Sequence, residues 1–119
     1  MKVIDVLDKM SGINDRWNPR IAASLNGQDL KLAKIEGDFV WHAHEKEDEL
    51  FYVVKGRLEM HFREKVAVIM PGQLIVVPKG VEHKPKASEE TWIMLFEPQN
   101  IDHTGGVDSP LRQHNIEHI

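Results

Sequence analysis

The chain has 119 residues, a formal net charge of −4 at pH 7 and no cysteine. This length supports one domain with a core of its own, but not two. The acidic balance and the lack of a clustered basic stripe argue against nucleic-acid binding, and the missing cysteines exclude disulfides, thiolate metal sites and cysteine nucleophiles.

The N-terminal segment predicts a docking arm and no targeting signal. Its apolar run is too short and its charge too acidic for a signal peptide, and no stretch of the chain is apolar enough to span a membrane. We therefore expect a soluble cytoplasmic protein. Residues 1–18 would form an arm, with an edge strand or one helical turn near Val6. Trp17, just before Asn18-Pro19, is expected to bury its indole against a sheet.

A β-hairpin is predicted next. Residues 20–25 and 28–35 are strand-like and flank Asn26-Gly27. Asn-Gly is the strongest short hairpin signal, because a type I′ turn needs positive φ at both of its central residues. Gly37 then interrupts the second strand.

Two histidines follow, in a segment predicted to be a strand (residues 39–44). Alternation along a strand would place Val40, His42 and His44 on one face. The side chains of Phe39 and Trp41 would then point outward. Two imidazoles one pleat apart on the same face can reach a single metal ion.

A charged turn at residues 45–48 leads to Glu49, which begins a strand rich in aromatic and β-branched residues (49–55). If this strand pairs with the preceding one, the Glu49 side chain lies close to His42 and His44. Its outward residues would also be apolar, and two neighbouring strands with apolar outer faces predict a covered surface. The cover would be the N-terminal arm or a second copy of the chain. The outward residues are Leu50, Tyr52 and Val54.

Two further strands are predicted at residues 57–63 and 66–70. His61 falls on the charged side of the first of them, so we expect it to be exposed; the alternative is a place at the mouth of a pocket. A second histidine segment then begins. Turn signals at Gly72 and at residues 78–80 flank a short apolar strand, and His83 follows directly.

The remaining chain predicts one more central strand. Residues 84–90 are polar and contain a proline, which favours a connection. Residues 91–97 are apolar on both faces, so they would be central and supply part of a pocket wall. Residues 98–119 read as a loop and tail. His114 and His118 stand four residues apart and would share a helix face that could bind a metal, although a solvated tail is the favoured interpretation.

Both histidine segments resemble the two motifs of the cupin superfamily. Four residues separate the first glycine from the first histidine, where the family more often has five, and Ala87 stands where the second motif ends in a non-ligand asparagine. The resemblance implies an all-β fold, a single double-stranded β-helix (jelly-roll) barrel of roughly nine or ten strands with little helix. One domain would span residues 1–119, with an arm (1–18), a barrel core (20–97) and a tail (98–119). The matching residues are Gly37, His42, His44, Glu49 and Gly56 in the first motif and Gly72, Pro78, Gly80 and His83 in the second.

Four of these positions are implied metal ligands: His42, His44, Glu49 and His83. Three imidazoles and a carboxylate suit divalent Mn, Fe, Co, Ni or Zn and disfavour Ca²⁺. A tetrahedral Zn²⁺ would be saturated by four ligands. An octahedral ion would keep two open positions for a substrate, or for a substrate and O₂.

Two classes of function follow from such a site. One is an enzyme with dioxygenase-like or sugar-isomerase-like chemistry, in which the ion itself acts as Lewis acid or redox centre, since no catalytic side chain can be named. The alternative is a non-catalytic module that holds a metal or a small ligand. The sequence shows no phosphate cradle beyond scattered lysines at positions 79, 84 and 86. We expect a small-molecule partner, no nucleic acid, no membrane and, from the resemblance, a homodimer.

Overall fold

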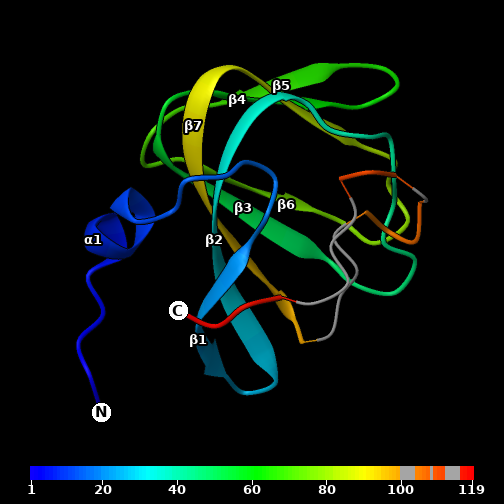
Figure 1. Ribbon diagram of the computed structural model, residues 1–119. Helices are drawn as coiled ribbons and strands as arrows, with labels where there is room; N and C mark the ends of the chain where they lie inside the picture. The colour runs from blue at the N-terminus through cyan, green and yellow to red at the C-terminus, as the bar shows by residue number, and fades with distance from the viewer. Residues whose placement is uncertain (100–103, 108, 112–115) are drawn as a thin grey trace.

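The computed structural model describes residues 1–99, 104–107, 109–111 and 116–119 (Figure 1). These residues contain one helix and seven strands, so the all-β prediction is confirmed. The expected nine or ten strands are too many; the predicted strand at residues 39–44, for example, forms only an isolated bridge between His42 and His83. The helix is α1 (Val6–Ser11), and the strands are β1 (Arg20–Leu25), β2 (Gln28–Asp38), β3 (Glu49–Lys55), β4 (Leu58–His61), β5 (Val66–Ile69), β6 (Leu74–Val77) and β7 (Lys84–Pro98).

All strand pairs are antiparallel, and the long strand β7 joins them into a barrel. The main order is β1-β2-β7-β3-β6, and β4 pairs with both β5 and the first part of β7. Strand β7 bends sharply along its length (yellow in Figure 1), so that its second half pairs with β3 while its first half pairs with β4. The interior of the curled sheet is where the site lies.

The predicted hairpin between β1 and β2 is confirmed. Leu25 pairs with Gln28 across the two-residue turn, and Asn26 and Gly27 have φ of 51° and 77°. These positive values are the ones that a type I′ turn requires.

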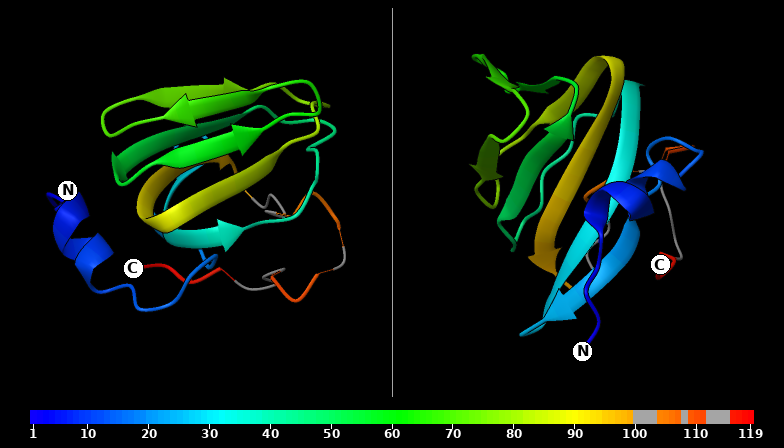
Figure 2. Two further views of the ribbon diagram at one scale, coloured as in Figure 1. Left: turned by 90° about the horizontal axis from the view of Figure 1, so that it is seen from above. Right: turned by 90° about the vertical axis from the view of Figure 1, so that its left-hand side faces the viewer.

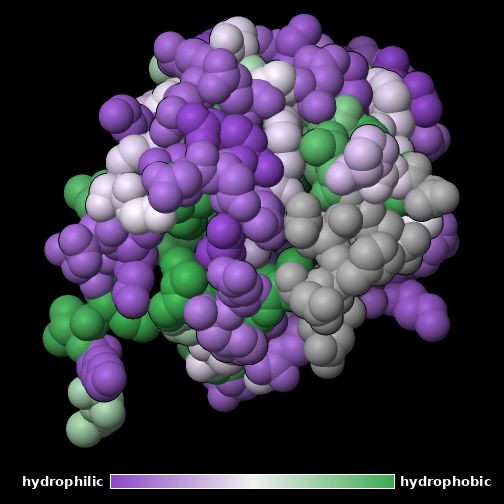
Figure 3. Space-filling model, in the orientation of Figure 1, coloured by the Kyte–Doolittle hydropathy of each residue, from purple (hydrophilic) through white to green (hydrophobic). Residues whose placement is uncertain are grey.

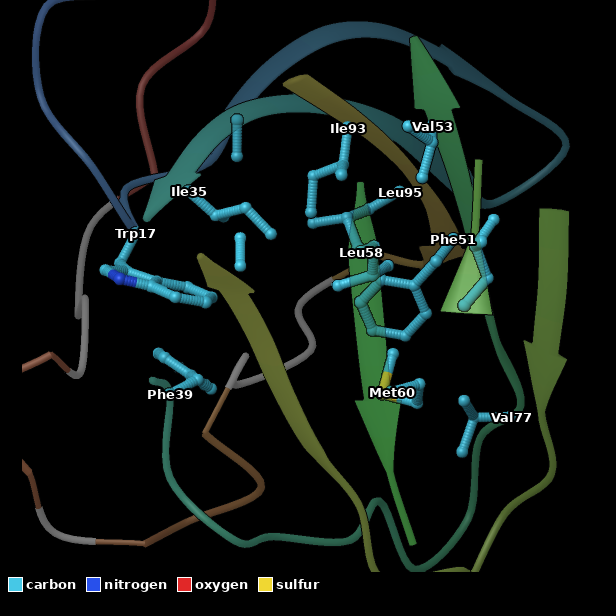
Figure 4. Close-up of a cluster of buried hydrophobic side chains, with 13 residues drawn as sticks. Trp17, Ile35, Phe39, Phe51, Val53, Leu58, Met60, Val77, Ile93 and Leu95 are labelled. Atoms are coloured by element: carbon cyan, nitrogen blue, oxygen red, sulfur yellow. The ribbon is translucent and has the colours of Figure 1, made fainter. Parts of the chain in front are cut away.

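The apolar core divides into an inner and an outer cluster. The inner cluster fills the barrel and includes Trp17, whose burial is thereby confirmed (Figure 4). The outer cluster forms where Met10 and Ile13 pack on Leu32 of β2. The arm therefore covers the outer face of β2 and β7, although the residues before α1 project away from the barrel (Figure 2). Within the described residues, no helix is long and apolar enough to cross a membrane.

Two strand predictions are wrong. Residues 39–44 are not a strand, because β2 ends at Asp38. A register shift between Ile35 and Gly37 and a φ of 84° at Gly37 redirect the chain before the histidines. Residues 84–90 are not a connection but the first part of β7. Pro85 lies opposite Met60 of β4, and its carbonyl accepts a hydrogen bond from the Phe39 N–H at 2.9 Å.

The described parts of the C-terminal segment lie against the barrel. The Ile21 N–H donates to the Glu117 carbonyl at 2.8 Å, and the Ile119 N–H donates to the Ile21 carbonyl at 2.9 Å. Thr104 is fully buried. His118 is exposed beside β1, whereas His114 lies outside the described residues, so the predicted histidine pair remains a prediction.

Candidate metal centre

The four predicted ligands meet inside the barrel. His42 and His44 come from the ligand loop, which we define as residues 39–48. Glu49 begins β3, and His83 immediately precedes β7. One ligand atom from each residue lies within 4.8 Å of the others, and all four side chains are buried.

Backbone hydrogen bonds hold the two halves of this cluster together. The His42 N–H donates to the His83 carbonyl at 3.0 Å, and the His83 N–H donates back at 2.9 Å. The Gly80 N–H donates to the His44 carbonyl at 2.8 Å. Glu49 is fixed from the other side, where β3 pairs with Val77 of β6. The ligand loop thus needs no strand of its own to present both histidines.

Two of the imidazoles have their tautomers fixed by backbone carbonyls. His42 Nδ1 lies 2.9 Å from the Val40 carbonyl oxygen, and His83 Nδ1 lies 2.9 Å from the Val81 carbonyl oxygen. A carbonyl only accepts, so each Nδ1 carries the hydrogen and each Nε2 keeps its lone pair. This is the arrangement by which proteins orient histidine ligands toward a metal.

Among the residues that the structure describes, three buried atoms of the cluster have no hydrogen-bond partner: His44 Nε2, Glu49 Oε1 and His83 Nε2. Glu49 Oε1 lies 3.3 Å from His44 Nε2 and 3.7 Å from His83 Nε2, without hydrogen-bond geometry. Buried polar atoms in proteins are nearly always paired, and an unpaired one costs free energy. The donor set and its orphaned atoms therefore fit a divalent metal ion.

The electrostatics favour the protonation states that a metal needs. Burial, followed by the charge of His83, lowers the pKa of His42 to about 4, so its imidazole is neutral near pH 7. Burial opposes the ionisation of Glu49, but contacts with His44 and His83 outweigh it and hold the pKa of this carboxyl below its usual range. A neutral imidazole and a carboxylate are the forms that bind divalent metals.

A small apolar cavity adjoins the cluster. His42 and Glu49 form part of its wall, and the remaining lining residues carry no charge. The space left for solvent is about 30 Å³, enough for roughly one or two water molecules. Ile93 and Leu95 of β7 belong to this wall, as the sequence predicted. The other lining residues are Trp17, Pro19, Ala33, Ile35, Phe39, Phe51 and Pro85.

Phe39 is the main error in the predicted site. Alternation predicts an outward side chain, yet Phe39 is only 7% exposed and lies inside the barrel. Its ring stacks on Trp17 with 4.8 Å between centroids (Figure 4). The ring also lies edge-to-face with His42, with 5.4 Å between centroids. Alternation gave the wrong face because residues 39–44 do not form a strand. Trp17 was predicted to be buried, but no sequence signal placed it beside the metal ligands.

Other candidate groups lie outside the cluster. His61 is partly exposed and its Nε2 lies 3.1 Å from Glu59 Oε1. Lys84 and Lys86 lie 3.1 Å and 3.9 Å from the carboxylate of Asp38. Neither these lysines nor Lys79 line the cavity.

Comparisons with known proteins agree with this architecture. Residues 30–97 match the model of the Cupin domain family. That match spans more than half of the chain, so the protein belongs to the cupin family, and it is a small cupin.

The chain is similar to a curated bacterial protein and to several solved structures. The uncharacterized protein YdbB of Bacillus subtilis (strain 168) is 33% identical over 81 residues, which is 67% of this chain and 72% of YdbB. A cupin-2 domain containing protein from Shewanella frigidimarina is 47% identical with a TM-score of 0.81, and the match covers 82% of this chain and 95% of that one. Protein NMB1881 from Neisseria meningitidis is 28% identical with a TM-score of 0.75, covering 82% and 100%.

Proposed function

We propose that this protein binds one divalent transition-metal ion through His42, His44, Glu49 and His83, and that the ion acts on a small organic molecule. The observation that carries the proposal is the set of three buried, unpartnered ligand atoms in one cluster. Mn, Fe, Co, Ni and Zn all suit this donor set. When bound, such an ion supplies Lewis-acid or redox chemistry.

The residues that line the cavity indicate which class of small molecule could bind there. Its aromatic and aliphatic wall favours a small apolar or aromatic compound, held with a polar group toward His42 and Glu49. A sugar phosphate would need a cationic partner, and the lining has none. Dioxygenase-like chemistry therefore fits the site better than sugar-phosphate isomerisation. In this role Trp17 and Phe39 would exclude water and stack on a flat substrate.

The second candidate is a metal-holding module without turnover. The small free space of about 30 Å³ favours it, because a substrate would have to displace part of the wall. In that case the four ligands would hold a tetrahedral ion with no exchangeable position. The coordination number separates the two candidates.

We also propose a homodimer, formed through the outer face of β3 and β6. Leu74 and Val76 of β6 are 56% and 48% exposed, and they stand opposite Tyr52 and Leu50 of β3. α1 does not cover this part of the sheet. A two-fold axis would pack the face on the same face of a second copy. The cytoplasmic location stays a prediction.

Metal analysis of the untagged protein, purified without chelators, tests the proposed site. We expect one ion per chain in the unaltered protein and loss of the ion in Glu49→Gln and His83→Ala, because each removes a ligand. His61→Ala, which changes a histidine outside the cluster, should keep the ion. Full occupancy in both ligand variants would refute the assignment. Six-coordinate metal with bound water would favour an enzyme, to be followed by assays of O₂ uptake.

A further inference from the structure

A buried ion pair lies on the inner face of the sheet beside Glu49. Lys31 Nζ of β2 lies 2.9 Å from Glu97 Oε1 of β7, and the two side chains are only 2% and 1% exposed. Burying two charges is costly, and such a pair adds little stability compared with apolar residues of similar size. Neither residue lines the cavity or belongs to the four-ligand cluster. The pair therefore calls for an explanation other than packing.

Strand register brings this pair to the metal centre. Leu50 of β3 pairs with Phe96 of β7, so the next residues on the inner face, Glu49 and Glu97, are neighbours. Both residues are buried, with Glu49 3% and Glu97 1% exposed. Within the described residues, the buried Glu97 Oε2 has no hydrogen-bond partner, whereas Glu97 Oε1 accepts from Lys31.

We infer that Glu97, held in place by Lys31, is a positioning residue that orients the Glu49 carboxylate toward the histidines. One oxygen of Glu97 accepts from Lys31, which fixes the carboxyl plane. Glu97 is the neighbour of Glu49 on the buried inner face, and in this role it restrains the Glu49 side chain, whose Oε1 lies beside His44 and His83. Glu97 itself does not bind the metal. This inference rests on the proposed metal site.

The test removes the pair without leaving a buried charge. Lys31→Met/Glu97→Leu replaces both charges by apolar side chains, a change that buried ion pairs commonly tolerate. Co²⁺ is the probe, measured by competition with a chelator and by its visible absorption spectrum. We expect the metal-free variant to fold, to bind Co²⁺ roughly 10- to 100-fold more weakly, as for other groups that support metal ligands, and to give an altered spectrum.

Two further variants separate positioning from packing. Glu97→Gln keeps an oxygen for Lys31 and an N–H for Glu49, so it should retain nearly the original Co²⁺ affinity and spectrum. Thr91→Val alters another fully buried residue of β7 whose hydroxyl bonds Arg57 and Glu89, away from the ligands. It should change stability but neither Co²⁺ readout.

Each contrary outcome has a definite meaning. Equal Co²⁺ affinity and spectrum in Lys31→Met/Glu97→Leu would overturn the positioning role while leaving the metal site intact. An equal loss in Thr91→Val would show that any disturbance of the barrel weakens binding, and would also overturn it. If the double variant does not fold, a large loss of affinity in Glu97→Gln still refutes the inference. Absence of Co²⁺ binding by the unaltered protein would overturn the proposed function as well.

Discussion

Gly105 lies directly against the backbone carbonyl of Ala43, the residue between His42 and His44. A Cβ added to Gly105 would overlap the Ala43 carbonyl oxygen, and its φ of 61° already disfavours a side chain. A residue near the C-terminus thus buttresses the ligand loop from outside the two histidine motifs.

We expect Gly105→Ala to weaken metal binding, because the new methyl group would push Ala43 and shift both neighbouring histidines. Gly106→Ala is the matched control: its φ of 84° is also positive, but no atom of the described residues lies within 4 Å of its Cβ position. Metal affinity by chelator competition checks the prediction. Equal affinities in the two variants would show that the contact does not support the loop.

Gly56→Ala should destabilise the fold more than Gly80→Ala. A Cβ at Gly56 would lie 2.5 Å from Thr91 Oγ1 and 2.8 Å from Thr91 Cα, whereas the same atom at Gly80 meets nothing within 4 Å. Both glycines have positive φ, 96° and 78°, so the backbone penalty is shared and the difference reports the clash. We expect it to be about 1–3 kcal/mol, measured by urea denaturation. A Gly80→Ala variant that loses as much would contradict this.

The metal-free protein should lose stability as the pH falls from about 6.5 to about 4. In this window His42 is protonated in the unfolded chain but neutral in the folded one, so acid favours unfolding. A pKa lowered from 6.5 to about 4 corresponds to about 3 kcal/mol. Denaturation at a series of pH values measures it. His42→Gln should flatten the curve by that amount, and an unchanged curve would show that His42 does not titrate this way.

Val76→Lys should convert a dimer into a monomer, since it places a charge in the middle of the proposed β3–β6 interface. Val66→Lys is a matched control on β5, because Val66 is 49% exposed and Val76 is 48% exposed. Sedimentation analysis across a range of concentrations gives the result. The proposal fails if the unaltered protein is monomeric, or if Val66→Lys dissociates it as well.

The residues before α1 are a second exposed apolar segment that could take part in a dimer. Val3 is fully exposed and Ile4 is 39% exposed, and Figure 3 shows apolar side chains on the projecting arm. Removing residues 1–4 tests whether the arm takes part. A dimer that survives this deletion but not Val76→Lys would place the interface on the sheet alone.

The local signals in the sequence predicted local structure well. The residue types of the Asn26-Gly27 turn and of the short apolar strands are enough to predict these elements. The prediction for residues 39–44 failed because alternation applies to a strand, and β2 ends at Asp38, directly after the positive φ of Gly37. The cluster of His42, His44, Glu49 and His83 could be predicted from the sequence because the spacing within two motifs resembles a known pattern.

The residues around that cluster could not be predicted from the sequence in the same way. Trp17 and Gly105 reach it from either end of the chain through tertiary packing. Glu97 is an ordinary strand residue in the sequence, and only the register of β7 against β3 sets it beside Glu49. Neither periodicity nor composition contains that register, so residues that support a site are harder to find than those that form it.

The carbonyls of Val40 and Val81 that orient two of the imidazoles belong to the main chain. Their hydrogen bonds do not depend on which side chains occupy those positions. Both valines pack beside the inner core and are only partly buried. The side chains at positions 40 and 81 can therefore vary during evolution or engineering while His42 and His83 keep their orientation. The packing around the metal centre can thus change without loss of the ligand geometry.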